Sequence, residues 1–181
     1  KLDLIPFIAT LGGQWVYRGA LKLLNNGATI TLRGTISDEA LTTLTYIGNG
    51  KFLGIPVPVY LVLVMAIALN FVLRHTVFGR SVYAVGGNSY SANMLAINVK
   101  RTKFLAHLIC GILAGIGGFV YFLHVGSGSP SHASGAEMNA IAASIIGGTM
   151  LTGGVGNIIG TLFGVLSLST IKNIVSSLGL D

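Results

Sequence analysis

The sequence contains few of the residues from which most active sites and metal sites are built. Its 181 residues include one cysteine, Cys110, which excludes an intramolecular disulfide and any metal site with several cysteine ligands. Five residues are acidic, and most of them lie in predicted loops or near the ends: Asp3, Asp38, Glu39, Glu137 and Asp181. We find no paired carboxylates and no Ser/His/Asp set, so the sequence indicates neither an enzyme active site nor redox chemistry.

The histidines and the glycine-rich segments give no sign of a cofactor. His75, His107, His124 and His132 lack the spacing of metal ligands, and a histidine inside an apolar helix more often bonds another helix. The segment 153–160, GGVGNIIG, lacks the Lys-Ser/Thr pair of a phosphate-binding loop and does not follow the dinucleotide fingerprint. We therefore predict no metal and no cofactor, and we interpret this segment as a helix break or a packing motif.

Apolar side chains, by contrast, are abundant. They form 52% of the chain, only 9% of residues are charged, and the mean hydropathy is +0.78. A soluble domain of this length needs more polar side chains to cover its surface. We therefore predict an all-α protein, a transmembrane helical bundle that crosses the membrane several times. The net charge of +6 does not indicate a nucleic-acid partner, because five of the eleven cations lie in one loop without a nucleic-acid-binding pattern.

That loop, residues 74–103, orients the chain. It contains no acidic residue and five basic ones: Arg74, Arg80, Lys100, Arg101 and Lys103. Short loops rich in Lys and Arg stay on the cytoplasmic side of a membrane. The loops predicted at 25–53 and 126–139 have no such excess, so we expect them outside.

Five apolar segments are candidate membrane spans. A helix needs about 20 residues to cross the hydrocarbon core. The predicted spans cover 4–24, 56–73, 104–125, 140–152 and 157–178. The fourth is short, and a glycine-rich turn near 153–157 separates it from the fifth.

Glycines recur at helical spacing in this region and in the third span. Gly156, Gly160 and Gly164 follow one another every fourth residue, as do Gly111 and Gly115. Each set occupies one helix face, where the missing side chains allow another helix to approach closely. We predict that both faces serve in helix packing.

The basic loop contains a candidate docking element. We expect Gly86 and Gly87 to form a sharp turn, Asn88 or Ser89 to cap a helix, and residues 89–96 to form a short amphipathic helix. A short helix held in the cytoplasm can bind in a groove of a partner. A plain connector with a capped turn explains these residues equally well.

Four blocks of the sequence, in order, carry a family resemblance. They are PFIATLGGQWVYRG at 6–19, GNGKFLGIPVP at 48–58, YAVGGNSYSANMLAIN at 83–98 and IAASIIGGTMLTGGVGNIIGTLFG at 141–164. Together they resemble the permease subunits of bacterial ABC sugar importers of the ribose, xylose and galactofuranose group. The resemblance covers nearly the entire chain.

The resemblance implies a multi-pass protein of the bacterial inner membrane that takes up a small sugar. Such a permease pairs with a second permease and receives sugar from an extracellular sugar-binding protein. Separate ABC ATPase subunits hydrolyse ATP, so the permease is not itself an enzyme. The resemblance also implies that the parent protein has further spans before this stretch and a final one after it.

The resemblance also identifies the basic loop as the segment that couples the permease to the ATPase. The residues expected at that contact are Gly79, Arg80, Gly86, Gly87, Asn88, Ala92, Asn93, Ile97 and Asn98. Ser91 and Ala96 depart from the family, which often has alanine and glycine at these positions.

Gln14 and Arg18 are the most prominent polar residues inside a predicted span. They are four residues apart and share a helix face. One interpretation is that they line the translocation path and contact sugar hydroxyls. The other, which we favour, is that Arg18 reaches the outer interface and Gln14 bonds a second helix.

Other functions fit parts of the sequence. A branched-chain amino-acid permease of the same superfamily would share the glycine-rich helices. A self-contained channel or secondary transporter would favour an acidic residue or an ion relay within a span, and the sequence shows neither. The simplest interpretation is a fragment whose helices only pack in the membrane and which has no function of its own.

Overall fold

The computed structural model describes residues 6–32 and 37–179, and most of them are helical. The first residues of the predicted span 4–24, together with Asp3 and Asp181, lie outside the described residues. The longer helices are α1 (Pro6–Leu24), α2 (Asp38–Asn49), α3 (Val57–His75), α6 (Val99–Val125) and α8 (Ile158–Ser177). The shorter ones are α4 (Val77–Gly87), α5 (Ser89–Met94) and α7 (Ala136–Ile146). Four two-residue strands complete the order: β1 (Ile30–Thr31), β2 (Lys51–Phe52), β3 (Ile55–Pro56) and β4 (Ser127–Gly128).

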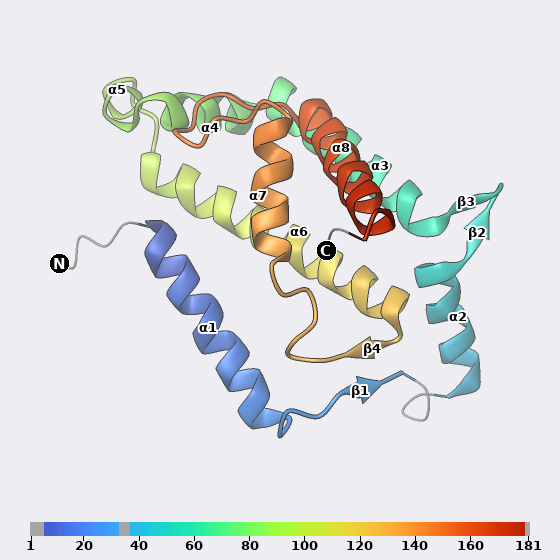
Figure 1. The fold of residues 1–181 in the computed structure, drawn as a ribbon. Helices are drawn as coiled ribbons and strands as arrows, with labels where there is room; N and C mark the ends of the chain where they lie inside the picture. Colours follow the sequence, from blue (N-terminus) through green and yellow to red (C-terminus); the bar gives the residue numbers. More distant parts are fainter. Residues whose placement is uncertain (1–5, 33–36, 180–181) are drawn as a thin grey trace.

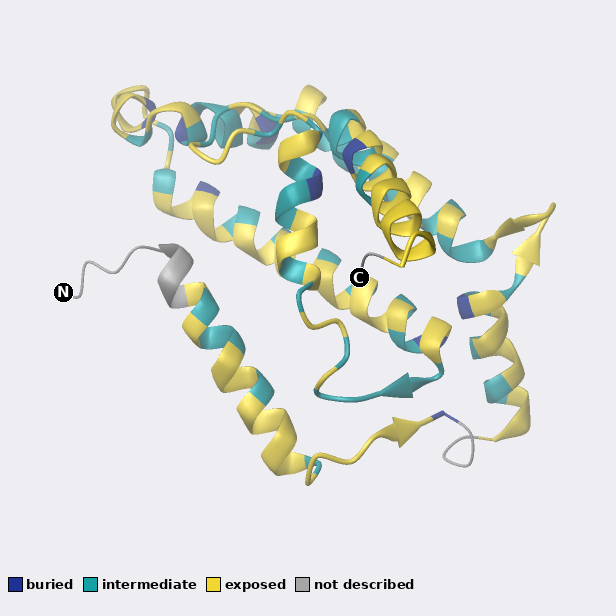
Figure 2. Cartoon of the chain, viewed as in Figure 1, coloured by how far each residue is buried: buried dark blue, intermediate teal, exposed yellow. Residues whose placement is uncertain are grey.

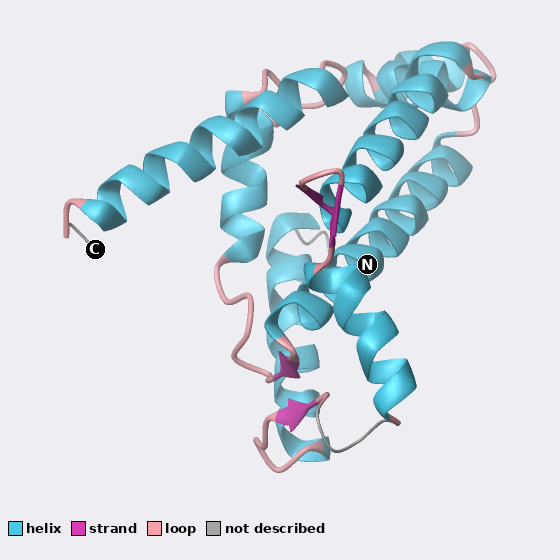
Figure 3. Cartoon of the chain, turned by 90° about the vertical axis from the view of Figure 1, so that its right-hand side faces the viewer, coloured by secondary structure: helices cyan, strands magenta, loops and turns pink. Residues whose placement is uncertain are grey.

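The two ends of the molecule are built differently. At one end lie α4, α5 and the connection between α7 and α8, and at the other lie β1 and β4 (Figure 1). β1 pairs antiparallel with β4, with Ile30 opposite Gly128. This pairing joins the loops predicted at 25–53 and 126–139, as expected for two loops on one side of a membrane. Figure 3 shows α8 extending away from the other helices towards the C-terminus.

Three helices in the described part of the chain, α3, α6 and α8, are long and apolar enough to cross a membrane. α1 contains Arg18 and Lys22 and is not among the three. α7 has 11 residues, and a helix of that length is only about 16 Å long, too short to cross the hydrocarbon core by itself. The spans expected at 4–24 and 140–152 therefore stay predictions, while the mostly helical membrane architecture is confirmed.

Many large apolar side chains of these three helices are exposed, and almost none is buried (Figure 2). α3 has no buried residue, although its mean hydropathy reaches 2.1. The buried apolar residues of the described chain are few: Leu32, Val85, Ala92, Leu123 and Ala143. An apolar helix surface of this kind needs lipid or other transmembrane helices around it.

A tight turn joins α3 to α4 and sets the direction of the basic loop. Thr76 ends α3, its backbone N–H bonding Val72 O, and it also begins α4, where its hydroxyl oxygen accepts a hydrogen bond from Gly79 N at 3.2 Å. Gly79 is buried, and a Cβ at this position would lie 2.5 Å from the carbonyl carbon of Leu73. Only glycine therefore allows α4 to start so close to the end of α3.

Candidate functional site

The basic loop is helical over most of its length, and side chains cap its helices. Asn88 Oδ1 accepts hydrogen bonds from Tyr90 N at 2.9 Å and Ser91 N at 3.0 Å, which begins α5. Asn98 Oδ1 accepts one from Arg101 N at 3.0 Å, which begins α6. Each such cap stabilises its helix by about 1 kcal/mol. The predicted cap at Asn88 and the short helix after it are confirmed, although α5 ends at Met94 rather than at residue 96.

The sharp turn expected at Gly86 and Gly87 is wrong. Both glycines belong to the last turn of α4, and the chain bends at Asn88 instead, with φ −155° and ψ 107°. A Cβ at Gly86 would lie 2.5 Å from Gly154 N, whereas a Cβ at Gly87 would meet nothing within 4 Å. Gly86 is therefore required for a backbone contact between two segments, not for a turn.

The end of α5 shows the backbone role of one of the two departures from the family pattern, Ala96. Ala96 has φ +58° and donates its N–H to Asn93 O, while Ile97 N donates to Ala92 O. These two bonds form a Schellman motif, in which the left-handed position is usually glycine. Ala92 is only 1% exposed, so it supports the turn from inside. The expectation that Ala92 and Gly79 contact an ATPase stays a prediction, and both residues are buried within the described chain.

The exposed members of the predicted contact form a surface at this end. Of the nine residues expected there, five are exposed: Arg80, Gly87, Asn88, Asn93 and Asn98. Sequence analysis missed the apolar side chains beside them, Tyr90, Met94 and Leu95, which are about 70% exposed. Tyr90 and Met94 are four residues apart and so share the helix face opposite Ala92, a signal that the sequence already carried. A groove of about 630 Å³ runs beside Asn93 and Lys100.

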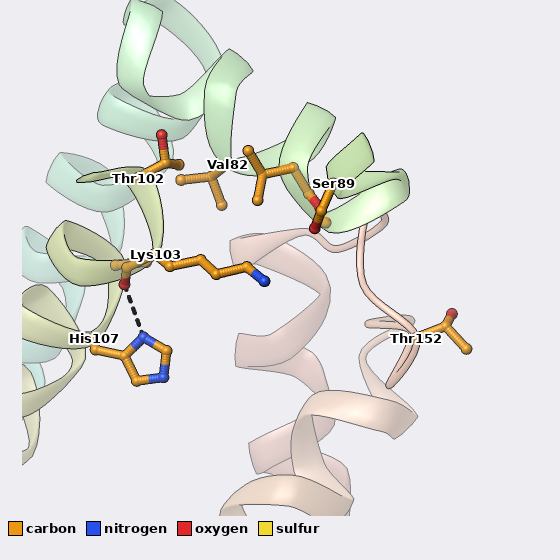
Figure 4. Close-up of a pocket in the computed structure, with 9 residues that line it drawn as sticks. Val82, Ser89, Thr102, Lys103, His107 and Thr152 are labelled. Atoms are coloured by element: carbon orange, nitrogen blue, oxygen red, sulfur yellow. Dashed lines mark hydrogen bonds between the residues drawn. The ribbon is translucent and has the colours of Figure 1, made fainter. Parts of the chain in front are cut away.

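A second cavity, of about 300 Å³, lies between α4, the first turns of α6 and the connection between α7 and α8 (Figure 4). The Lys103 side chain extends into it from α6, Val82 lines it from α4, Ser89 from the start of α5 and Thr152 from the connection. His107 Nδ1 lies 2.8 Å from the carbonyl oxygen of Lys103. Lys103 carries a positive charge and none of the described lining residues is acidic, so the cavity has a net positive charge.

Gln14 and Arg18 face a different part of the chain. Arg18 donates hydrogen bonds to Pro130 O at 3.3 Å and Ala133 O at 3.4 Å. A hydrogen bond from the Gln14 side chain and the nearby Arg18 charge help to hold the pKa of the Glu137 carboxyl below its ordinary value. These contacts tie α1 to the start of α7. The Gln14 contact agrees with the role we favoured, a hydrogen bond to a second helix. Arg18 bonds backbone carbonyl groups of the chain, and its position at the outer interface stays a prediction.

The glycines predicted to pack have three different environments. Gly160 and Gly164 lie where α8 meets α7, and a Cβ at either position would meet Gly147 O or Ala143 O. Gly156 precedes α8, which starts at Ile158, so it does not share that helix face as expected. A Cβ at Gly111 or Gly115 would meet no atom of the described residues within 4 Å. The packing role of these two glycines stays a prediction.

Comparisons with known proteins identify the family of the chain. The protein-family model described as "Branched-chain amino acid transport system / permease component" matches residues 1–180. The chain belongs to this family. The curated relatives of this permease-family chain include the ribose import permease protein RbsC of Escherichia coli (strain K12), 36% identical over 97% of the chain and 54% of the relative. RbsC of Bacillus subtilis (strain 168) is 39% identical over 100% of the chain and 55% of the relative.

A further relative of this permease-family chain is the xylose transport system permease protein XylH of Escherichia coli (strain K12). It is 35% identical over 93% of the chain and 44% of the relative. The chain thus spans about half the length of the curated relatives it matches. No solved structure gives a significant match. The resemblance stated from the four sequence blocks is confirmed, and the chain is part of a multi-pass membrane protein.

Two long-range contacts of this permease-family chain are not predicted from its sequence. Tyr83, on α4, donates its hydroxyl proton to Gly156 O at 3.0 Å across 73 residues of sequence. Glu137 was assigned to a loop, whereas it lies in the first turn of α7 and meets Gln14. No local pattern relates either residue to its partner, because both contacts depend on how distant helices pack.

Proposed function

We propose that the full-length protein is the membrane-spanning permease subunit of an ATP-driven importer for a small sugar. The observation that carries this proposal is the 36–39% identity to ribose import permeases over at least 97% of the chain. The substrate class we propose is a monosaccharide such as ribose, xylose or galactofuranose. We place the protein in the bacterial inner membrane.

The proposed partners are a second permease, two ABC ATPase subunits and an extracellular sugar-binding protein. The surface around Asn93, Tyr90 and Met94 supports a docking role, because it combines exposed apolar and amide side chains on a capped helix. ATP hydrolysis belongs to the ATPase subunits, and the permease makes and breaks no covalent bond. Closure of the ATPases would move α5 and α4, and the attached spans would then change the side to which the path opens.

Gln14 and Arg18 contribute to this proposal as structural links. Their side chains already bond the segment that leads into α7. This arrangement favours the role of joining α1 to α7 over direct contact with a sugar.

The competing proposal is a branched-chain amino-acid permease, favoured by the description of the family. Reconstitution of the full-length protein with its ATPase and binding protein in liposomes separates the two. We expect ATP-dependent uptake of a labelled pentose or hexose and no uptake of leucine. Uptake of leucine in place of sugar would support the competing proposal, and sugar uptake that does not depend on ATP would contradict an ABC importer.

A further inference from the structure

The backbone of α4 touches the connection between α7 and α8, residues 147–157, without any intervening side chain. A Cβ at Gly153 would lie 2.7 Å from Gly86 O, and a Cβ at Gly154 would lie 2.7 Å from Gly87 Cα. Gly153 and Gly154 have φ values of +94° and +78°, a conformation that favours glycine. The contact therefore depends on glycine on both sides.

Tyr83 fixes the same contact one turn earlier in α4. Its hydroxyl group donates to Gly156 O at 3.0 Å, and Tyr83 is partly buried. A backbone contact has no rotamers that could absorb a displacement, and this hydrogen bond opposes sliding between the two segments. The close backbone contact and this hydrogen bond together hold α4 against residues 147–157.

The connection is itself held together by backbone hydrogen bonds and packs against both α7 and α8. Thr149 N bonds Ser144 O at 3.0 Å, and Met150 N bonds Val155 O at 3.1 Å. A Cβ at Gly147 would lie 2.5 Å from the carbonyl carbon of Gly160, so α7 and α8 pack closely just below the connection.

The far end of α7 meets α1. Glu137, in the first turn of α7, is the partner of Gln14, and Arg18 bonds the segment immediately before this helix. α7 therefore joins the contact at α4 to a polar contact with α1, and its lower end lies near the middle of the molecule, above β4 (Figure 1).

From this chain of contacts we propose that Tyr83, Gly86, Gly153 and Gly154 are positioning residues of the transport cycle. They lock α4 to the connection 147–157, so that α7 moves as a lever whenever the ATPases displace α4 and α5. This inference rests on the proposed function. It adds to it a second coupling element, 147–157, that lies outside the basic loop.

The test compares variants of the full-length protein, reconstituted with its ATPase and binding protein. Tyr83→Phe removes only the hydroxyl group, and Tyr60→Phe is its matched control, because Tyr60 donates a hydrogen bond of the same 3.0 Å length to Phe52 O. Gly86→Ala separates the two backbones, and Gly118→Ala is its control, because a Cβ at Gly118 meets nothing within 4 Å. Asn93→Arg tests the proposed docking surface in parallel.

We expect Tyr83→Phe to lower the ratio of stimulated to basal ATP hydrolysis by about two- to tenfold, as one lost hydrogen bond allows. Gly86→Ala should lower it further, with the ATPase still co-purifying. A merely structural role would lower the amount of assembled protein and leave this ratio unchanged. Normal ratios for Tyr83→Phe and Gly86→Ala, with loss for Asn93→Arg, would overturn this inference alone. Normal ratios for all three would overturn the proposed docking surface as well.

A cross-link tests whether the contact stays closed during transport. Val82→Cys on α4 and Thr152→Cys in the connection, which line one cavity, are joined by a short bis-maleimide in a Cys110→Ala background. We expect uptake to survive cross-linking, because the two segments move together. Strong inhibition that depends on both cysteines would show that the contact opens in each cycle and would overturn the lever.

Discussion

Ala96 holds the least favourable backbone conformation of the basic loop. A φ of +58° is unfavourable for alanine by about 1–2 kcal/mol, whereas glycine adopts it freely at a smaller entropic cost of about 0.5–1 kcal/mol. We therefore predict that Ala96→Gly stabilises the α5 turn and slows hydrogen exchange at the Ile97 amide, which bonds Ala92 O. The control is Ala84→Gly within α4, which should destabilise its helix by about 1 kcal/mol. Faster exchange at Ile97 in Ala96→Gly would contradict the Schellman assignment.

Glu137 gives the link between α1 and α7 a pH dependence. Its pKa is lowered in the folded chain, first by the Gln14 hydrogen bond and also by the Arg18 charge. A carboxyl group with a lowered pKa stabilises the fold above its unfolded pKa and loses that contribution as pH falls through the folded pKa. Glu137→Gln should therefore lower Tm at pH 7, and its difference from wild type should shrink below about pH 4. The measurement is Tm against pH in detergent, with Glu39→Gln as a control for the charge change. A difference that does not vary with pH would contradict the carboxylate contact.

At the scale of elements, close packing of α7 on α8 depends on glycine. A Cβ at Gly164 would meet Ala143 O and would lie 2.8 Å from Gly147 N. Overpacking of this kind typically costs about 1–3 kcal/mol. We predict that Gly164→Ala and the larger Gly160→Leu lower thermal stability and membrane assembly of the full-length protein, while Gly118→Ala does not. Equal stability of all three variants would place this face of α8 against lipid.

Local signals predicted some elements and missed others for identifiable reasons. The long apolar helices α3, α6 and α8 followed from hydropathy alone, and Asn88 followed from its preference for helix starts. α4 did not, because its sequence VFGRSVYAVGG contains three glycines, which disfavour an isolated helix. Its packing against Leu73 through Gly79 and against Gly154 through Gly86 outweighs that local preference. Contacts between distant segments determine this part of the site, and local sequence patterns do not record them.

At the scale of the whole molecule, the distribution of charge and the pairing of β1 with β4 predict one topology. Single cysteines at Ser37, Ser131 and Ser91, all exposed positions, should report it in intact cells. A Cys110→Ala background is needed because Cys110 is exposed. A membrane-impermeant maleimide should label positions 37 and 131 in intact cells. It should label position 91 only after the membrane is permeabilised. Labelling of position 91 in intact cells would contradict the predicted orientation and place the basic loop outside.

The central claim is that the surface of α5 couples this permease to an ATPase. The most direct measurement is binding-protein-stimulated ATP hydrolysis by the full-length protein and its partners in liposomes. Asn93→Arg changes an exposed residue without disturbing buried Ala92, and Asn93→Gln keeps an amide at the same position as the control. We predict that Asn93→Arg loses most of the stimulated hydrolysis and the sugar uptake at unchanged membrane levels, while Asn93→Gln retains both. Wild-type stimulation and uptake by Asn93→Arg would contradict the claim and leave the loop a plain connector.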